Sequence, residues 1–145
     1  MFFLILVFIK NGIKQQNEFV DLLNSHQKTG INALFVQIRT ASDALYAKSA
    51  EPWTTYLSGK QGQAPSPYYD PLEFMIDQTH ARGMEFHAWL NLNRATMSSR
   101  SLLSSEHVAR KHPEWLLSYN GQLLFDFGIP AVRHYIAGLV RNIIQ

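Results

Sequence analysis

An alternation of helix and strand signals is the feature that most constrains the fold of this chain. Apolar residues at helical spacing over residues 12–28 precede a β-rich run at 31–39, and a second helix signal from Asp70 precedes a second run at 84–91. Such an order predicts parallel strands joined by right-handed crossovers. A barrel and an open doubly wound sheet both satisfy it.

The start of the second helix is the clearest local signal. Asp70 is suited to the N-cap, Pro71 to the first helical position, and Glu73 completes a capping box. Gly83 supplies a stop after this helix, as Gly30 does for the first helix. Both helices are therefore expected to be separate elements that lie between strands.

The second half of the chain interrupts this alternation with other elements. A short helix is expected over 105–111, a hairpin whose strands cover 115–119 and 122–126, and an amphipathic helix from Pro130 onward. Asn120-Gly121 is typical of a type I′ hairpin turn. We therefore predict an α/β fold, a partial TIM-like (β/α) barrel of parallel strands with an inserted β-hairpin. A full barrel takes about 250 residues, whereas this sequence has 145.

The N-terminus carries an unbroken apolar run from Phe2 to Ile9. A bilayer span takes about 20 residues, and the run lacks the basic flank and the cleavage site of a signal peptide. A native strand, a signal remnant and a mistaken start all stay open, and membrane association follows only from a signal remnant. We treat 1–145 as one truncated barrel domain, with 1–11 as an atypical apolar N-terminus.

Composition excludes several classes of function. The net charge of +2, without a cluster of Lys and Arg, argues against nucleic acid as a partner. The absence of Cys excludes disulfides and thiolate metal sites. The histidines lack metal-ligand spacing and no glycine-rich phosphate loop is present, so we expect neither a metal nor a cofactor.

Polar side chains occur on one face of both strands, toward their C-terminal ends. They are Gln37 and Arg39 in the first strand and His87, Trp89 and Asn91 in the second. A parallel strand buried on both faces is normally almost entirely apolar, and ligands bind at the C-terminal ends of strands in barrels and open α/β sheets alike. The pattern predicts a ligand site there, although a polar network satisfied inside the barrel would have the same sequence.

A connection of thirty residues, from Thr40 to Tyr69, follows the first of these strands. Long connections of this kind are usually functional or disordered. It holds Asp43, Glu51 and Trp53 among other aromatic residues. Aromatic faces beside carboxylates suit a sugar, which has apolar C–H faces and many hydroxyls. Alternatively, the aromatic residues simply anchor the loop to the body of the domain.

Several sequence blocks, in order, carry a resemblance to a known family. They are Phe35-Val36-Gln37-Ile38-Arg39, Glu51-Pro52-Trp53, Leu57-Ser58-Gly59-Lys60-Gln61-Gly62, Tyr69-Asp70-Pro71-Leu72, Arg82-Gly83-Met84-Glu85-Phe86-His87-Ala88-Trp89-Leu90-Asn91 and His112-Pro113-Glu114-Trp115. From about residue 12 to the end, the chain resembles the bacterial glycosyl-hydrolase-like family 10.

The resemblance implies a TIM-like barrel that hydrolyses O-glycosidic bonds. Members include envelope-associated or secreted hydrolases of polysaccharides such as peptidoglycan glycan, so the implied partner is a polysaccharide or oligosaccharide. The positions that match the family's strand-end pattern, expected to bind substrate, are Gln37, Arg39, Asp43, Trp53, His87, Trp89 and Asn91.

The carboxylates leave the catalytic role open. Glycoside hydrolysis normally needs two carboxyl groups, about 5 Å apart for retention or about 6.5–9.5 Å for inversion. Asp43 and Glu51 are on the long loop, where they are expected to bind hydroxyls, and Asp126 ends a hairpin strand within reach of the cleft. Asp43 and Asp126 are the catalytic candidates, whereas Glu85 begins its strand at the opposite end. No pair stands out, and the Asp-rich strand that follows the last helix in the family is absent here. The chain is expected to be a fragment of a glycoside hydrolase, or alternatively a non-catalytic carbohydrate-binding or degenerate remnant. A third interpretation is an open α/β module for an unrelated small ligand.

Overall fold

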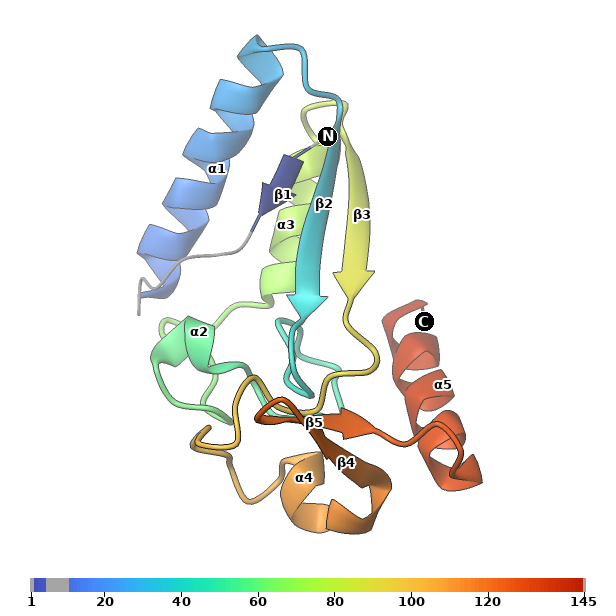
Figure 1. Cartoon of the computed structure of the whole chain (residues 1–145). Coiled ribbons are helices and arrows are strands. Elements are labelled where there is room, and N and C mark those ends of the chain that lie inside the picture. The colour runs from blue at the N-terminus through green and yellow to red at the C-terminus, as the bar shows by residue number, and fades with distance from the viewer. Residues whose placement is uncertain (1, 5–10, 145) are drawn as a thin grey trace.

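A three-stranded parallel sheet forms the centre of the molecule in the computed structural model, which describes residues 2–4 and 11–144. Its strands are β1 (Phe2–Leu4), β2 (Ala33–Arg39) and β3 (Glu85–Leu90), in the spatial order β1-β2-β3 (Figure 1). The predicted parallel pairing of the two main strands is therefore confirmed. β1 pairs with residues 34–36 of β2, so part of the apolar N-terminal run is a strand, and the rest of that run lies outside the described residues.

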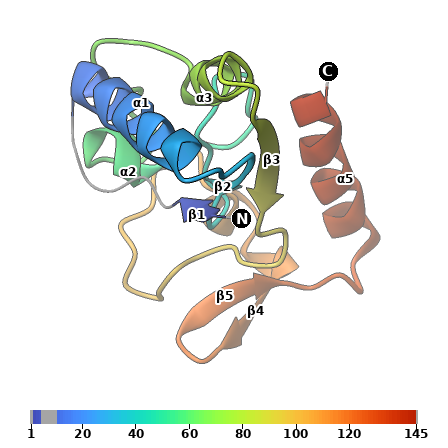
Figure 2. The ribbon, with the colours of Figure 1, turned by 90° about the horizontal axis from the view of Figure 1, so that it is seen from above.

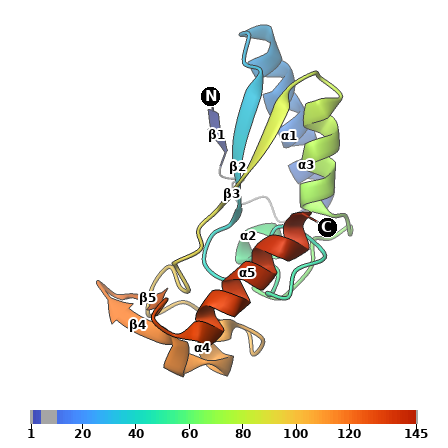
Figure 3. The ribbon, with the colours of Figure 1, turned by 90° about the vertical axis from the view of Figure 1, so that its right-hand side faces the viewer.

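The helices α1 (Gly12–Lys28) and α3 (Pro71–His80) follow β1 and β2, respectively. Figures 2 and 3 show both helices on the same side of the sheet. Successive crossovers that turn the same way put every helix on one face, as in a barrel, whereas a doubly wound sheet requires a reversal of direction. The strand order β1-β2-β3 contains no such reversal.

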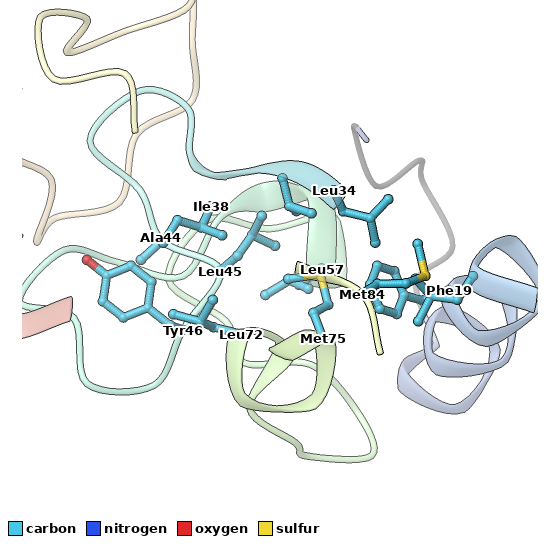
Figure 4. Close-up of a cluster of buried hydrophobic side chains, with 12 residues drawn as sticks. Phe19, Leu34, Ile38, Ala44, Leu45, Tyr46, Leu57, Leu72, Met75 and Met84 are labelled. Atoms are coloured by element: carbon cyan, nitrogen blue, oxygen red, sulfur yellow. The ribbon is translucent and has the colours of Figure 1, made fainter. Parts of the chain in front are cut away.

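The core lies between this face of the sheet and the two helices (Figure 4). Leu34, Val36 and Ile38, which the alternation of β2 assigned to the helix side, are at most 1% exposed. Phe19 from α1 and Met75 from α3 complete the same cluster. Full burial of one such side chain stabilises a fold by about 1.5–3 kcal/mol, so the apolar face of β2 determines which way the sheet is covered.

Capping determines where the helices begin. Asp70 is the N-cap of α3, and its Oδ1 accepts hydrogen bonds from the backbone N–H groups of Leu72 (3.0 Å) and Glu73 (3.4 Å), as the sequence predicted. Its Oδ2 also accepts from the N–H of Ala47 at 3.0 Å. The residue that starts α3 therefore also ties the long connection after β2 to this helix.

The segment after β3 contains α4 (Val108–Lys111), a 3₁₀ turn at 113–115, the hairpin β4 (Leu116–Tyr119) and β5 (Gln122–Phe125), and α5 (Pro130–Ile144). The hairpin is confirmed, with positive φ angles at both residues of its turn, as type I′ requires. The predicted helix at 105–111 is shorter than expected. It begins only after His107, because the ring of that residue caps it.

The long connection after β2 contains a short helix, α2 (Thr55–Ser58), that we did not predict. The helix α5 buries Val132, Ile136 and Leu139 from its predicted apolar face. Among the described residues, none of these helices has the length and apolar character needed to cross a bilayer.

Candidate active site

The connection after β2 lies at the C-terminal ends of β2 and β3, where the sequence placed a ligand site (Figure 1). The first residues of this connection fold back on β2, where Ala44 forms isolated β-bridges with both Arg39 and Trp53. The segment from Thr40 to Tyr46 is buried throughout. This connection is therefore an ordered wall of the strand-end region.

Arg39 is buried rather than presented to a ligand, which corrects its expected role in direct substrate binding. Its Nε and Nη2 donate to the two carboxylate oxygens of Glu51, both at 2.6 Å, and the side chains of the pair are at most 1% exposed. Nη2 also donates to Ser42 Oγ at 3.0 Å, and Nη1 donates to the carbonyl of Asn91. A buried guanidinium requires such partners because an unpaired buried charge is very costly.

Glu51 connects this ion pair to α5. The Tyr135 hydroxyl donates to Glu51 Oε1 at 2.8 Å. Burial raises the pKa of Tyr135, and the negative charge of Glu51 raises it further. Burial alone would lower the pKa of Arg39, but its hydrogen bond to Glu51 and the charge of Glu51 outweigh burial, so this pKa is raised. Glu51 is therefore occupied by structural contacts with Arg39 and Tyr135.

Gln37, His87 and Trp89 form what we call the strand-end surface, on the sheet face opposite α1 and α3. Gln37 pairs with Trp89 in the β2–β3 register, and Trp89 is 39% exposed. The His87 ring stacks on Phe35, with centroids 4.5 Å apart and planes at 9°, and its Nε2 lies 3.0 Å from Glu85 Oε2. These three predicted residues are therefore neighbours, and an aromatic face lies beside polar groups.

Asn91 and Trp53 lie outside this surface. Asn91 Oδ1 accepts from the N–H of Arg94 at 3.2 Å, so the side chain shapes the turn after β3. Trp53 is half-buried against the main core and meets the ring of Tyr68 edge-on, with centroids 6.4 Å apart at 88°. These contacts of Trp53 agree with the alternative interpretation of the sequence, in which aromatic residues anchor the long connection to the body of the domain.

A pocket of about 590 Å³ lies beside the strand ends, between the connection after β2 and the loop after β3. Its walls are formed by Thr40, Ala41, Asp43, Thr55, Tyr56, Gly59, Lys60, Gln61, Thr96, Met97, Ser101, Leu102, Leu103 and Ser104. Asp43 is the only predicted site residue among them. Its Oδ1 accepts from the Thr40 hydroxyl (2.7 Å) and the Ala41 N–H (3.3 Å), which hold the carboxylate in place.

The other acidic candidates do not join Asp43. Asp126 Oδ1 accepts from the Gly128 N–H at 2.8 Å, in the turn that leads to α5, and Asp126 does not line the pocket. Glu85 is exposed at the N-terminal end of β3. Within residues 2–4 and 11–144, Asp43 is the one carboxylate that lines the pocket, and no acid and nucleophile pair is assembled around it.

Most pocket residues were missed by the sequence reasoning, which assigned no role to Lys60, Gln61 or the serines at 98–105. The structure brings these two loops together, because Gln61 Oε1 accepts from the Ser104 N–H at 2.9 Å. The sequence signal that could have identified Lys60 and Gln61 was the block at 57–62, which resembles the family. In the part of the chain that the structure describes, no three His, Asp or Glu side chains are arranged to hold a metal ion.

His107 holds the pocket wall in place through its contact with Ala41. This side chain is fully buried; its Nε2 donates to the Ala41 carbonyl at 3.1 Å, and its Nδ1 accepts from the Ala109 N–H at 3.1 Å. Burial lowers the pKa of His107, although the Ala41 carbonyl and the charges of Asp43 and Glu51 oppose this effect. The neutral ring is therefore the form that the fold requires.

Acidification should consequently destabilise the fold through His107. Its ordinary pKa is about 6.5, so below that pH the unfolded chain binds a proton that the folded chain resists. The contribution of neutral His107 to the free energy of unfolding is fully present above about pH 6.5. It is lost as the pH falls toward the lower pKa that His107 has in the folded state. Urea unfolding at pH 7.5 and 5.5 should show a smaller loss of stability for His107→Asn than for the wild type. His134→Asn, at an exposed position on α5, should lose as much stability between the two pH values as the wild type does. An equal loss in all three proteins would contradict the assignment of this pH dependence to His107.

Two glycosidases of known structure have a similar fold. The maltogenic α-amylase AmyB of Thermotoga neapolitana matches with a TM-score of 0.56 and 15% identity, over 88% of this chain and 31% of that protein. The GH36 α-galactosidase AgaA of Geobacillus stearothermophilus matches with a TM-score of 0.59 and 17% identity, over 89% of this chain and 17% of that protein. Both are TIM barrels, so the likeness shows the predicted fold, a partial barrel.

Sequence relatives point to one family. The chain is 45% identical over 134 residues to glycosyl hydrolase YngK of Bacillus subtilis and 34% identical over 141 residues to glycosyl hydrolase DigH of Escherichia coli K12. It spans only 26% and 32% of these relatives, although the matches cover 91% and 90% of the chain itself. The profile of the family described as glycosyl hydrolase-like 10 matches residues 6–145. The chain therefore belongs to the glycosyl hydrolase-like 10 family, as its sequence blocks indicated.

Proposed function

We propose that this chain supplies the carbohydrate-binding part of a glycoside hydrolase, and that the full-length enzyme cleaves O-glycosidic bonds of a bacterial polysaccharide such as peptidoglycan glycan. The observation that carries the proposal is the strand-end surface, where the exposed ring of Trp89 lies beside Gln37 and His87. Such a substrate implies that the enzyme works in the cell envelope or outside the cell.

The chemistry of this surface suits a sugar ring. An indole face packs against the C–H groups of a pyranose, and flanking amide and imidazole groups exchange hydrogen bonds with its hydroxyls. The surface lies at the C-terminal ends of the strands, where barrel enzymes place their substrates. Membership of the glycosyl hydrolase-like 10 family supports a carbohydrate as the ligand.

Catalysis needs a second carboxyl group besides the one that this chain contributes to its pocket. Hydrolysis uses two carboxyl groups on either side of the scissile bond, and Asp43 is the carboxylate that lines the pocket. We place the second carboxyl group in the part of the full-length relatives that this chain does not span. Incubation of the chain with peptide-free glycan strands should therefore give binding without new reducing ends. Release of shortened products by this chain alone would contradict that division.

A non-catalytic remnant is the second candidate. The observation in its favour is that Glu51 and Asp126 are both engaged in structural hydrogen bonds. This candidate predicts that fusing the missing segment of a relative to the chain fails to restore hydrolysis. The first candidate predicts that the fusion cleaves glycan strands.

Trp89→Ala should weaken the binding of peptide-free glycan strands by about fivefold, because loss of a stacking face costs of the order of 1 kcal/mol. Isothermal titration calorimetry measures this change. Trp115→Ala is the control, since that ring stacks on His112 with centroids 3.9 Å apart and belongs to the hairpin core. Equal losses of affinity in the two variants would remove Trp89 from the site.

A further inference from the structure

We propose that the 590 Å³ pocket is a second sugar-binding subsite, separate from the strand-end surface, which takes a sugar unit of the same glycan chain. The inference rests on the proposed carbohydrate function, because it assumes that the ligand is a glycan. It goes further by assigning a ligand class to residues outside the predicted site. Ligand pockets typically have volumes of about 300–1,000 Å³, so this pocket can hold a small saccharide.

The walls of the pocket differ in character. Asp43, Gln61 and Ser104 are polar wall residues, whereas Met97 and Leu103 are apolar. A pyranose has the same two characters, a hydroxyl-rich edge and an apolar face of C–H groups. A fully apolar ligand would displace water from the Asp43 carboxylate without replacing its hydrogen bonds, which is costly.

Asp43 offers a fixed acceptor. Both hydrogen bonds that it receives, from Thr40 and Ala41, go to Oδ1. Oδ2 accepts no hydrogen bond from the residues that the structure describes. Asp43 lines the pocket although the whole residue is only 4% exposed. A charged acceptor in such surroundings forms strong hydrogen bonds to hydroxyl donors, which a sugar supplies in abundance.

Ser104 offers a buried group without a partner. Its hydroxyl oxygen is shielded from solvent and has no hydrogen-bond partner among the described residues. An unsatisfied buried hydroxyl costs about 1–3 kcal/mol, and buried polar groups without partners are uncommon in folded proteins. Ser104 lines the pocket, so its side chain must rotate about χ1 before a sugar hydroxyl bound there supplies the missing partner.

The loops that form the pocket are joined to one another before any ligand arrives. The Ser104 N–H donates to Gln61 Oε1, and His107 Nε2 donates to the carbonyl of Ala41. A preformed site avoids the entropic cost of ordering loops when the ligand binds. Gln37, His87 and Trp89 do not line this pocket, so it can be occupied while the strand-end surface holds another unit of the chain.

The test is an NMR titration of the full 145-residue chain with the peptide-free tetrasaccharide of peptidoglycan glycan, followed through assigned backbone amides. We expect two groups of shifts, one at Gln61, Thr96 and Ser104 and one at Gln37 and Trp89. Ser104→Ala and Asp43→Asn should each raise the Kd measured at the first group about fivefold or more. Ser105→Ala, which alters an exposed neighbour that does not line the pocket, should leave that Kd unchanged.

The outcomes separate the pocket from the proposed function. Shifts confined to the strand-end surface, or a wild-type Kd in both pocket variants, would overturn the pocket and leave the proposed function intact. Shifts confined to the pocket would support the subsite and remove Trp89 from the proposed function. An absence of shifts at either place at millimolar tetrasaccharide would overturn both.

Discussion

Replacement of Glu51 by Ala should lower the free energy of unfolding by about 3–5 kcal/mol, because it leaves the buried guanidinium of Arg39 without its counter-charge. The two side chains are at most 1% exposed and share two hydrogen bonds of 2.6 Å. The variant also removes the acceptor of the Tyr135 hydroxyl, so α5 loses its polar attachment to the strand ends. This is the largest effect that we expect from one substitution.

Urea unfolding followed by circular dichroism measures this loss. Glu114→Ala is the matched control, since that carboxylate is 63% exposed beside His112, and its replacement should leave the unfolding midpoint unchanged. A double variant, Arg39→Met with Glu51→Leu, should be more stable than Glu51→Ala alone, because apolar residues of similar volume often replace a buried pair without loss. A double variant as unstable as the single one would show that the uncompensated charge is not the cause.

Leu34→Ala should cost about 2–5 kcal/mol, the range for truncating a buried leucine that leaves a cavity. Leu34 is fully buried in β2, on the face covered by α1 and α3 (Figure 4). The same urea titration measures this change. Leu102→Ala removes the same atoms from a residue that is 95% exposed and should have no measurable effect on stability. Similar midpoints for the two variants would contradict the assignment of the faces of β2.

Local signals were sufficient for most of the secondary structure. The N-cap at Asp70, the hairpin turn at Asn120-Gly121 and the two-residue period of β2 each depend on neighbours in the chain, and all three appear as predicted. The limits of the short helix α4 were less predictable. The His107 ring that caps it is itself held by the Ala41 carbonyl, 66 residues away, and no local pattern encodes such a contact.

The site was predicted only in part, for the same reason. The strand period predicted Arg39 and Gln37 on one face, but the register shifts between these two residues. The period also cannot show that Glu51 folds back to neutralise Arg39 while Gln37 stays partly exposed. Likewise, Ser104 lines the pocket because Gln61 holds its loop against the connection after β2.

The sequence by itself determined the order of the elements, the parallel strands, the apolar face of β2 and, through its blocks, the family. These properties follow from short-range spacing of side chains and from motifs that lie within single segments. Only the tertiary structure decided that Arg39 and Glu51 form a buried pair, that Trp53 packs against the main core, and that the connections after β2 and β3 together enclose the pocket beside Asp43. A buried charge takes its role from the partner that packing brings to it, and that partner comes from elsewhere in the chain.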